Sequence, residues 1–230
     1  MSGNQDGVFN FTAPVFLDFP SLLEPKKFKD RAGKETGEAK YSAGLRFTPA
    51  HPDFQALKTM MAQIAKAEWP VRPLTELSWP HESGDKKADK RKMENANIQA
   101  KIDAGTPGLK LLPDAEFMRG HVILTARSKY QPRLAIFRNN TPVDLEDAAI
   151  KANISQFYFG VEVLAQVKLQ AYRGVGQNPD GVCAYLNMVL SLNRGPKIGG
   201  GAKASAADVF KGYSGTVTQE NPLADDEIPF

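Results

Sequence analysis

Alternating apolar and polar positions dominate the second half of the chain and predict antiparallel strands. The longest run covers residues 157–172, where apolar side chains occupy every second position. A period of two over this length predicts a strand with one face in a core. Asn178-Pro179-Asp180-Gly181 is typical of a hairpin turn, and residues 182–192 are expected to form the returning strand. Gly160 is the position where so long a strand is expected to bend.

Shorter elements are predicted elsewhere in the chain. Alternation predicts strands at residues 15–19 (ended by Pro20), 40–48, 121–130 and 133–137. Apolar residues at helical spacing between Pro52 and Glu68 predict one long helix. Residues 71–105 form a long polar insertion, in which the charged stretch 85–101 is expected to be a solvated helix. These elements predict a mainly β protein, a small and partly open antiparallel barrel.

Composition narrows the class of protein. In 230 residues, 42% are hydrophobic and 24% charged, which excludes wholesale disorder. No apolar run approaches the roughly 20 residues of a membrane span, and the N-terminus lacks a secretory signal. Cys183 is the single cysteine, so an intramolecular disulfide and a cysteine-based zinc finger are excluded. A reducing compartment, the cytoplasm, is therefore expected.

Charge divides the chain into a basic body and an acidic end. The formal net charge is +3, but residues 216–230 hold four acids and no Lys or Arg. Residues 1–215 therefore hold 22 acids against 29 bases, a balance of +7. Glycines at 199–201 indicate a linker. The predicted organisation is a barrel domain at 1–213 and a flexible acidic interaction tail, expected to be disordered, at 214–230.

Residues capable of catalysis are sparse. His51, His81 and His121 have no partner at metal-ligand spacing, and neither a phosphate loop nor a nucleophile motif occurs. Cys183 lies in an apolar strand run and is predicted to be a buried structural thiol. Asp144, Glu146 and Asp147 are interpreted as a solvated turn or a helix N-terminus rather than a metal site. No catalytic residue, metal or cofactor is predicted, and the protein is not expected to be an enzyme.

Basic residues interleaved with aromatics favour the binding of single-stranded nucleic acid. Cations neutralise phosphates, and the bases of an unpaired strand stack on exposed rings. The predicted groove contacts are Lys27, Phe28, Lys29, Arg46, Arg127, Lys129, Tyr130, Arg133, Tyr158, Lys168, Tyr172 and Arg173. Because no base-reading motif occurs, sequence preference is expected to be weak.

The end of the chain has the composition of a recognition peptide. Its residues are Asp225, Asp226, Glu227, Ile228, Pro229 and Phe230. A partner's pocket could take the terminal ring while basic side chains pair with the carboxylates. The four acids of residues 216–230 could also occupy the groove when DNA is absent, since they mimic phosphates, and the tail would be freed for partners when DNA binds.

Two resemblances follow from these residues. The tip at 225–230 resembles the C-terminal tip of bacterial single-stranded DNA-binding proteins, with Glu227 in place of an Asp. The body is similar to a family of bacteriophage single-stranded DNA-binding proteins, related in fold to those of T7-like phages. The matching stretches are 19–26, 40–43, 54–69, 119–121 and 159–193.

The family resemblance implies an OB-fold, no enzymatic activity and a location in the host cytoplasm. It also implies that the protein coats single-stranded DNA in phage replication, recombination or repair. The tail would recruit host or phage replication and recombination proteins. Alternatives are a strand-annealing recombination mediator, a nuclease or repair accessory enzyme on an OB-like fold, and an RNA-binding module.

Overall fold

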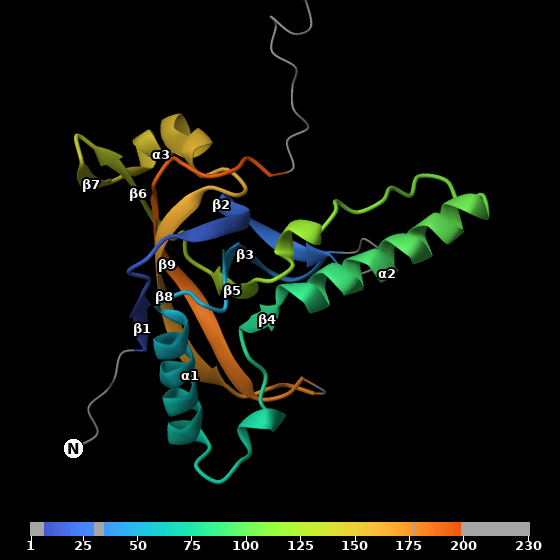
Figure 1. Cartoon of the computed structure of the whole chain (residues 1–230), viewed down its shortest axis with the longest axis horizontal. Coiled ribbons are helices and arrows are strands. Elements are labelled where there is room, and N and C mark those ends of the chain that lie inside the picture. Colours follow the sequence, from blue (N-terminus) through green and yellow to red (C-terminus); the bar gives the residue numbers. More distant parts are fainter. Residues whose placement is uncertain (1–6, 30–34, 177, 199–230) are drawn as a thin grey trace, which may run out of the picture. The chain divides into compact units, whose positions relative to one another are not determined.

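A five-stranded ring forms the centre of the protein. The computed structural model describes residues 7–29, 35–176 and 178–198 (Figure 1). Neighbouring strands pair in the order β8-β2-β3-β5-β9, and β9 pairs back onto β8, which closes the ring. Within this ring the β5–β9 pair is parallel and the other pairs are antiparallel. The strands are β2 (Val15–Lys29), β3 (Glu35–Phe47), β5 (Val122–Ser128), β8 (Glu162–Tyr172) and β9 (Gly181–Ser191).

The mainly β, OB-like barrel predicted from the sequence is confirmed, with its ring closed. Inward-facing side chains alternate along β8, as Val163, Ala165 and Val167 show. They fill the barrel because successive strand residues point to opposite faces. The seam between β8 and β2 is short, and the Cα partners there are Val15–Val163 and Phe16–Glu162.

The long strand begins later than its periodicity predicts. The alternation is confirmed from Glu162 to Tyr172, but residues 157–161 form a turn. Gly160 has φ +93°, and a Cβ there would lie 2.1 Å from the carbonyl oxygen of Pro196. Only glycine fits this conformation and this approach. Phe157 is nevertheless buried in the core, although it lies in a turn and not in the strand.

β2 is interrupted where the sequence predicts its end. The prediction that Pro20 ends the strand is wrong, since β2 continues to Lys29 after a shift of register between Asp18 and Ser21. A proline is tolerated at such a bulge because no ladder hydrogen bond is required of it. Beyond the bulge β2 and β3 continue together as a hairpin, called here the β2–β3 arm (residues 21–29 and 35–42).

Helix α1 (Phe54–Glu68) packs against β8 and β9 and confirms the predicted long helix. Its buried residues Leu57, Met61 and Ala65 recur every four positions and form one apolar stripe. At its start, the Asp53 carboxylate accepts hydrogen bonds from the backbone N–H and the hydroxyl of Thr12. This contact ties α1 to the segment that enters β2.

Helix α2 (Gly84–Asp103) occupies the polar insertion, as expected, and projects from the barrel (Figure 1). Only Gly84 and Ala88 of α2 are buried. Ala88 joins a small apolar cluster with Ile123 and Met118, outside the barrel core. The return segment at 104–114 follows α2 back, where the Asn95 amide exchanges two hydrogen bonds with the backbone of Leu112.

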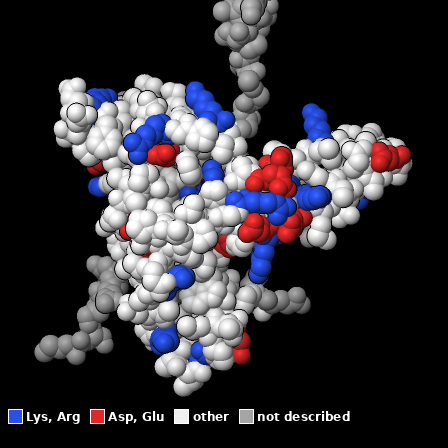
Figure 2. Space-filling model, viewed as in Figure 1, with Lys and Arg blue, Asp and Glu red and all other residues white. Residues whose placement is uncertain are grey.

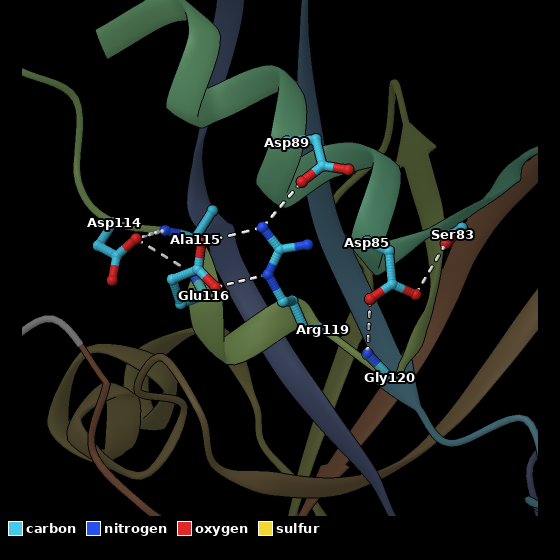
Figure 3. A network of polar contacts seen from close by, with 8 residues as sticks. All are labelled: Ser83, Asp85, Asp89, Asp114, Ala115, Glu116, Arg119 and Gly120. Carbon is cyan, nitrogen blue, oxygen red and sulfur yellow. Dashed lines mark hydrogen bonds and ion pairs between the residues drawn. The ribbon is translucent and has the colours of Figure 1, made fainter. Parts of the chain in front are cut away.

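A polar network fastens the base of α2 (Figure 3). Arg119 donates hydrogen bonds to Asp89 of α2 and to Glu116, and the N–H of Gly120 donates to Asp85. Acidic and basic side chains therefore gather side by side where α2 leaves the barrel (Figure 2). Because several contacts share this base, α2 is held at a defined position despite its small apolar contact.

The remaining elements extend the sheet or connect the strands. The short strands are β1 (Val8–Asn10), β4 (His81–Ser83), β6 (Arg133–Arg138) and β7 (Thr141–Asp144), and the short helices are η1 (Leu74–Glu76), η2 (Glu116–Met118), α3 (Asp147–Asn153) and η3 (Ile154–Gln156). Glu146 precedes α3, which confirms the helix N-terminus expected there. Within the described residues, no helix is long and apolar enough to cross a membrane.

Candidate nucleic-acid interface

Basic residues occupy outward-facing positions on adjacent strands. Lys26 of β2 lies opposite Lys40 of β3, and Ser42, two residues further along β3, lies opposite Arg127 of β5. Residues directly opposite in neighbouring strands share one face of a sheet. Here that face is the outer one, because Ala43, the next residue of β3, points to the opposite face and is buried. Three cations are thus aligned across three strands.

These cations line a groove of about 710 Å³, called here the cationic groove. The β2–β3 arm and β5 supply its walls, which carry four cations and two acids. Its lining residues are Ser21, Pro25, Lys26, Lys27, Glu35, Glu38, Ala39, Lys40, Ser42 and Arg127. An open groove with an excess of positive charge attracts a polyanion.

The outer face continues past the groove onto β9 and β8. Ala126 lies opposite Ala184 in the parallel pair, so the next residues, Arg127 and Tyr185, are neighbours on the outer face. Tyr185 in turn lies opposite Lys168 of β8. Both of these side chains are exposed. A ring and a further cation thus follow the groove along the same surface.

Ion pairs adjust the charge around the groove. The Lys129 ammonium lies 2.8 Å from a Glu38 carboxylate oxygen, and their hydrogen bond lowers the pKa of Glu38 and raises the pKa of Lys129.

Lys87 of α2 reaches Thr125 on β5, with 3.5 Å between Nζ and Oγ1. Burial lowers the pKa of Lys87, Glu82 opposes this effect, and the nearby positive charge of Arg127 lowers the pKa further. The base of α2 therefore adds a cation beside Arg127.

A buried ion pair lies on the same outer face, under α2. Arg46 Nε donates to both carboxylate oxygens of Asp18, at 3.2 and 2.9 Å. The guanidinium lies between the rings of Phe16 and Phe117, 4.6 and 5.2 Å from their centroids. Burial raises the pKa of Asp18 to about 6, although the charge and the hydrogen bond of Arg46 act in the opposite direction. With only 4% of its surface exposed, Arg46 does not reach the cationic groove.

Three phenylalanines cluster beside this pair. The ring centroid of Phe19 lies 4.4 Å from that of Phe159, and the centroid of Phe117 lies 5.2 Å from that of Phe159. Phe19 is 46% exposed and has φ +45°, a conformation that is rare outside glycine. Backbone strain at an exposed ring is a feature that often accompanies a functional surface.

The predicted contact residues fall into several groups. Lys27 and Arg127 line the cationic groove, and Lys129 lies beside it through Glu38. Tyr130 follows Lys129 and is 82% exposed. Phe28 and Lys29 belong to the β2–β3 arm by their backbone pairing with Thr36 and Glu35, and their side chains lie outside the described residues.

The other predicted contacts lie away from the groove. Arg133 is on β6, Tyr172 ends β8, and Arg173 pairs with Glu68 of α1 at 2.8 Å. The Tyr158 hydroxyl donates to the carbonyl of Gly195. Lys168 lies two strands from Arg127, beside Tyr185. The structure thus brings part of the predicted set together and distributes the rest around the barrel.

Sequence reasoning omitted three residues of this surface, namely Lys26, Lys40 and Tyr185. Lys40 and Tyr185 alternate with the buried residues of their strands, and this alternation could have placed them on an outer face. Lys26 gives no such signal, because its face depends on register shifts in β2.

Cys183 is only half-buried, so the prediction of a buried thiol is corrected. It occupies an outward position on β9, opposite Gln170, and its thiol donates to the Gln170 carbonyl at 3.4 Å. Burial still raises its pKa, and a raised pKa disfavours the nucleophilic thiolate. The part of the chain that the structure describes contains no cluster of His, Cys, Asp and Glu able to hold a metal ion. The tail residues at 225–230 lie outside the described residues.

The closed OB-like barrel defines this protein as an OB-fold protein, and its outer face carries a groove with more cations than acids. The family profile described as "Enterobacter phage Enc34, ssDNA-binding protein" matches residues 11–222. The chain therefore belongs to the family of the Enc34 phage single-stranded DNA-binding protein, as the sequence resemblance predicted.

Solved structures of the Enc34 protein agree with this fold. The Enc34 protein in complex with ssDNA is 16% identical, with a TM-score of 0.58 over 85% of this chain and 91% of that chain. A second structure of the Enc34 protein is 15% identical, with a TM-score of 0.55 over 90% and 91% of the two chains. The gp2.5 single-stranded DNA-binding protein of bacteriophage T7 is 12% identical, with a TM-score of 0.42 over 83% and 92%. No curated protein matches the chain.

Proposed function

We propose that this protein is a non-catalytic single-stranded DNA-binding protein that coats unpaired strands during phage DNA replication, recombination or repair. The observation that carries the proposal is the cationic groove on the outer face of an OB-like barrel, in a chain of the Enc34 family. The lysines and Arg127 would pair with phosphates. Exposed rings beside them, Tyr130 and Tyr185, would stack on bases.

An unpaired strand suits this surface better than duplex DNA does. The outer sheet face offers cations in a row together with exposed rings, and rings can contact only bases that are not stacked in a duplex. The described residues place no helix in the groove that could enter a major groove. Binding should therefore favour single strands and tolerate any sequence.

Fluorescence anisotropy with labelled oligo(dT), duplex DNA and RNA tests the proposal. Wild type should bind oligo(dT) more tightly than duplex, with affinity that falls as salt rises. The variant Lys26→Glu/Arg127→Glu should bind at least tenfold more weakly. A matched control, Lys66→Glu/Lys151→Glu, places the same charge change on exposed positions of α1 and α3 and should bind almost like wild type. Equal weakening of both variants, or no preference for single strands, would refute the groove as the DNA site.

The tail would recruit partner proteins. Its acids followed by Ile228, Pro229 and a terminal Phe230 form a peptide suited to a pocket with a basic rim. A synthetic peptide of residues 220–230 should displace a labelled bacterial tail peptide from a bacterial protein that binds it. The same peptide with Phe230→Ala should compete at least tenfold more weakly, because the ring fills the pocket. Equal competition by both peptides would show that the ring of Phe230 does not contribute to binding of the tail.

A further inference from the structure

Charge is unevenly distributed around helix α2. Residues three, four and seven positions apart share one edge of a helix. Lys87, Lys90 and Lys101 follow this spacing along one edge, interrupted by Glu94. We call these three residues the lysine edge. The far edge carries Asp85, Asp89 and Asp103.

The contacts at the base of α2 fix the direction in which each edge points. Lys87, the first residue of the lysine edge, contacts Thr125 on the outer face of β5. Thr125 is two residues from Arg127 and therefore shares its face. On the far edge, Asp89 binds Arg119, and Asp85 accepts from the Gly120 N–H (Figure 3). The lysine edge is thus continuous with the cationic groove, and the acidic edge is turned away from it.

The outer lysines of this edge are available for a ligand. Lys90 and Lys101 are exposed, and within the described residues neither forms an ion pair. Glu94, the acid between them, lies 3.7 Å from Arg91 of the same helix, which partly compensates its charge. A helix that buries only Gly84 and Ala88 is longer than its own packing requires. The exposed length of the lysine edge is therefore free to contact a ligand, and its positive charge suits an anionic one.

We propose that the lysine edge of α2 binds the phosphates of the DNA strand where the strand leaves the cationic groove. This inference rests on the proposed function and adds a second contact region outside the barrel. Lys87 to Lys101 spans about 21 Å at the rise of an α-helix. At about 3.4 Å per phosphate of a stacked strand, this length corresponds to at most about six nucleotides. Helix α2 would thus lengthen the site and contribute no base contacts.

Strand length separates the two contact regions in an experiment. An oligo(dT) of about eight nucleotides fills a single OB site, whereas one of about 25 nucleotides reaches α2 as well. The test variant is Lys90→Glu/Lys101→Glu. The matched control, Lys66→Glu/Lys92→Glu, makes the same charge change on α1 and on the other side of α2, at exposed positions. Anisotropy titrations at several salt concentrations measure affinity and its salt dependence for both lengths.

The proposal predicts a loss only on the long strand. There the test variant should bind about tenfold more weakly than the control, and its log–log salt slope should fall by about 1.4, or about 0.7 for each lost phosphate contact. On the short strand the two variants should bind alike. Equal affinities and slopes on the long strand would overturn the role of the lysine edge, and equal losses on both lengths would reduce it to a general charge effect. If wild type binds neither length, the proposed function itself fails.

Discussion

The Asp18–Arg46 ion pair is buried, so desolvation governs its contribution to stability. Both side chains lose their hydration on folding. The attraction between the two charges offsets this desolvation cost only when their geometry is excellent. Arg46 Nη2 is buried without a hydrogen-bond partner, so the compensation is incomplete. The pKa of Asp18 rises to about 6 for the same reason, since burial disfavours the carboxylate more than Arg46 favours it. The pair therefore links stability to pH.

Asp18→Asn should change stability differently at different pH. A carboxyl group whose pKa is raised from 3.8 to about 6 on folding contributes stability that is complete below about pH 4 and is lost as pH rises through 6. Asn cannot ionise, so the free energy of unfolding of the variant should rise relative to that of wild type by about 2 kcal/mol between pH 4 and 7. Urea unfolding of both proteins at each pH measures this gain. A constant difference across the range would show that Asp18 has an ordinary pKa.

Tyr130 is the residue at which stacking and charge can be separated. Its ring is 82% exposed and follows Lys129, so it is available to a base. Tyr130→Ala should weaken binding to oligo(dT) by about 1–3 kcal/mol, and Tyr130→Phe should bind like wild type, because stacking needs the ring and not the hydroxyl. The salt slope should stay the same in both variants, since no phosphate contact is lost. Affinities measured at two salt concentrations check both statements, and loss in the Phe variant would point to a hydrogen bond instead.

At the scale of elements, the periodicity of hydrophobic residues predicts most of the helices and strands of the barrel. The stripe of α1 and the alternation of β8 are read directly from the sequence because each element buries a single face. Irregular backbone was harder to predict. The sequence indicated a bend at Gly160, but the turn found there depends on close contact with distant Pro196, which no local pattern encodes. The irregularity at Phe19 and Pro20, where Phe19 has a positive φ, was not predicted. The length of the β2–β3 arm was not predicted either, because most of its residues are exposed and apolar and polar positions do not alternate along it.

The packing of α1 against the barrel should contribute strongly to stability. Met61 is fully buried in the middle of its apolar stripe. Met61→Ala should lower the free energy of unfolding by about 2–5 kcal/mol, because it removes packing atoms and leaves a cavity. Lys66→Ala, on the exposed side of the same helix, should change it by less than about 0.5 kcal/mol. Chemical denaturation compares the two, and a small loss in the Met61 variant would mean that α1 is dispensable for the barrel.

At the scale of the whole molecule, topology carries information that the sequence does not display. Cations on β2, β3 and β5 form one groove only because Lys26 lies opposite Lys40 and Ser42 lies opposite Arg127. Register between strands so far apart is set by the closed ring, in which β5 and β9 also run parallel. Sequence reasoning could therefore identify the residue types of the interface, but it assigned some residues to a groove that they do not reach. Arg173, paired with Glu68 of α1, is one of these.

The balance of charge between body and tail predicts that removal of the tail changes the affinity for DNA. Removing residues 216–230 deletes four acids and no base, which takes the formal net charge from +3 to +7. If the tail competes with phosphates for the cationic groove, the truncated protein should bind oligo(dT) about tenfold more tightly at low salt, or by about 1.4 kcal/mol. The gain should shrink toward zero near 1 M salt, where the screening length is about 3 Å.

A control distinguishes charge from the apolar end of the tail. The full-length variant Ile228→Ala/Phe230→Ala keeps all four acids and should bind DNA like wild type. Titrations of the three proteins across a salt series separate the outcomes. Unchanged or weaker binding after truncation would exclude competition by the tail. A gain in the Ile228→Ala/Phe230→Ala variant would instead assign the competition to the apolar side chains of Ile228 and Phe230.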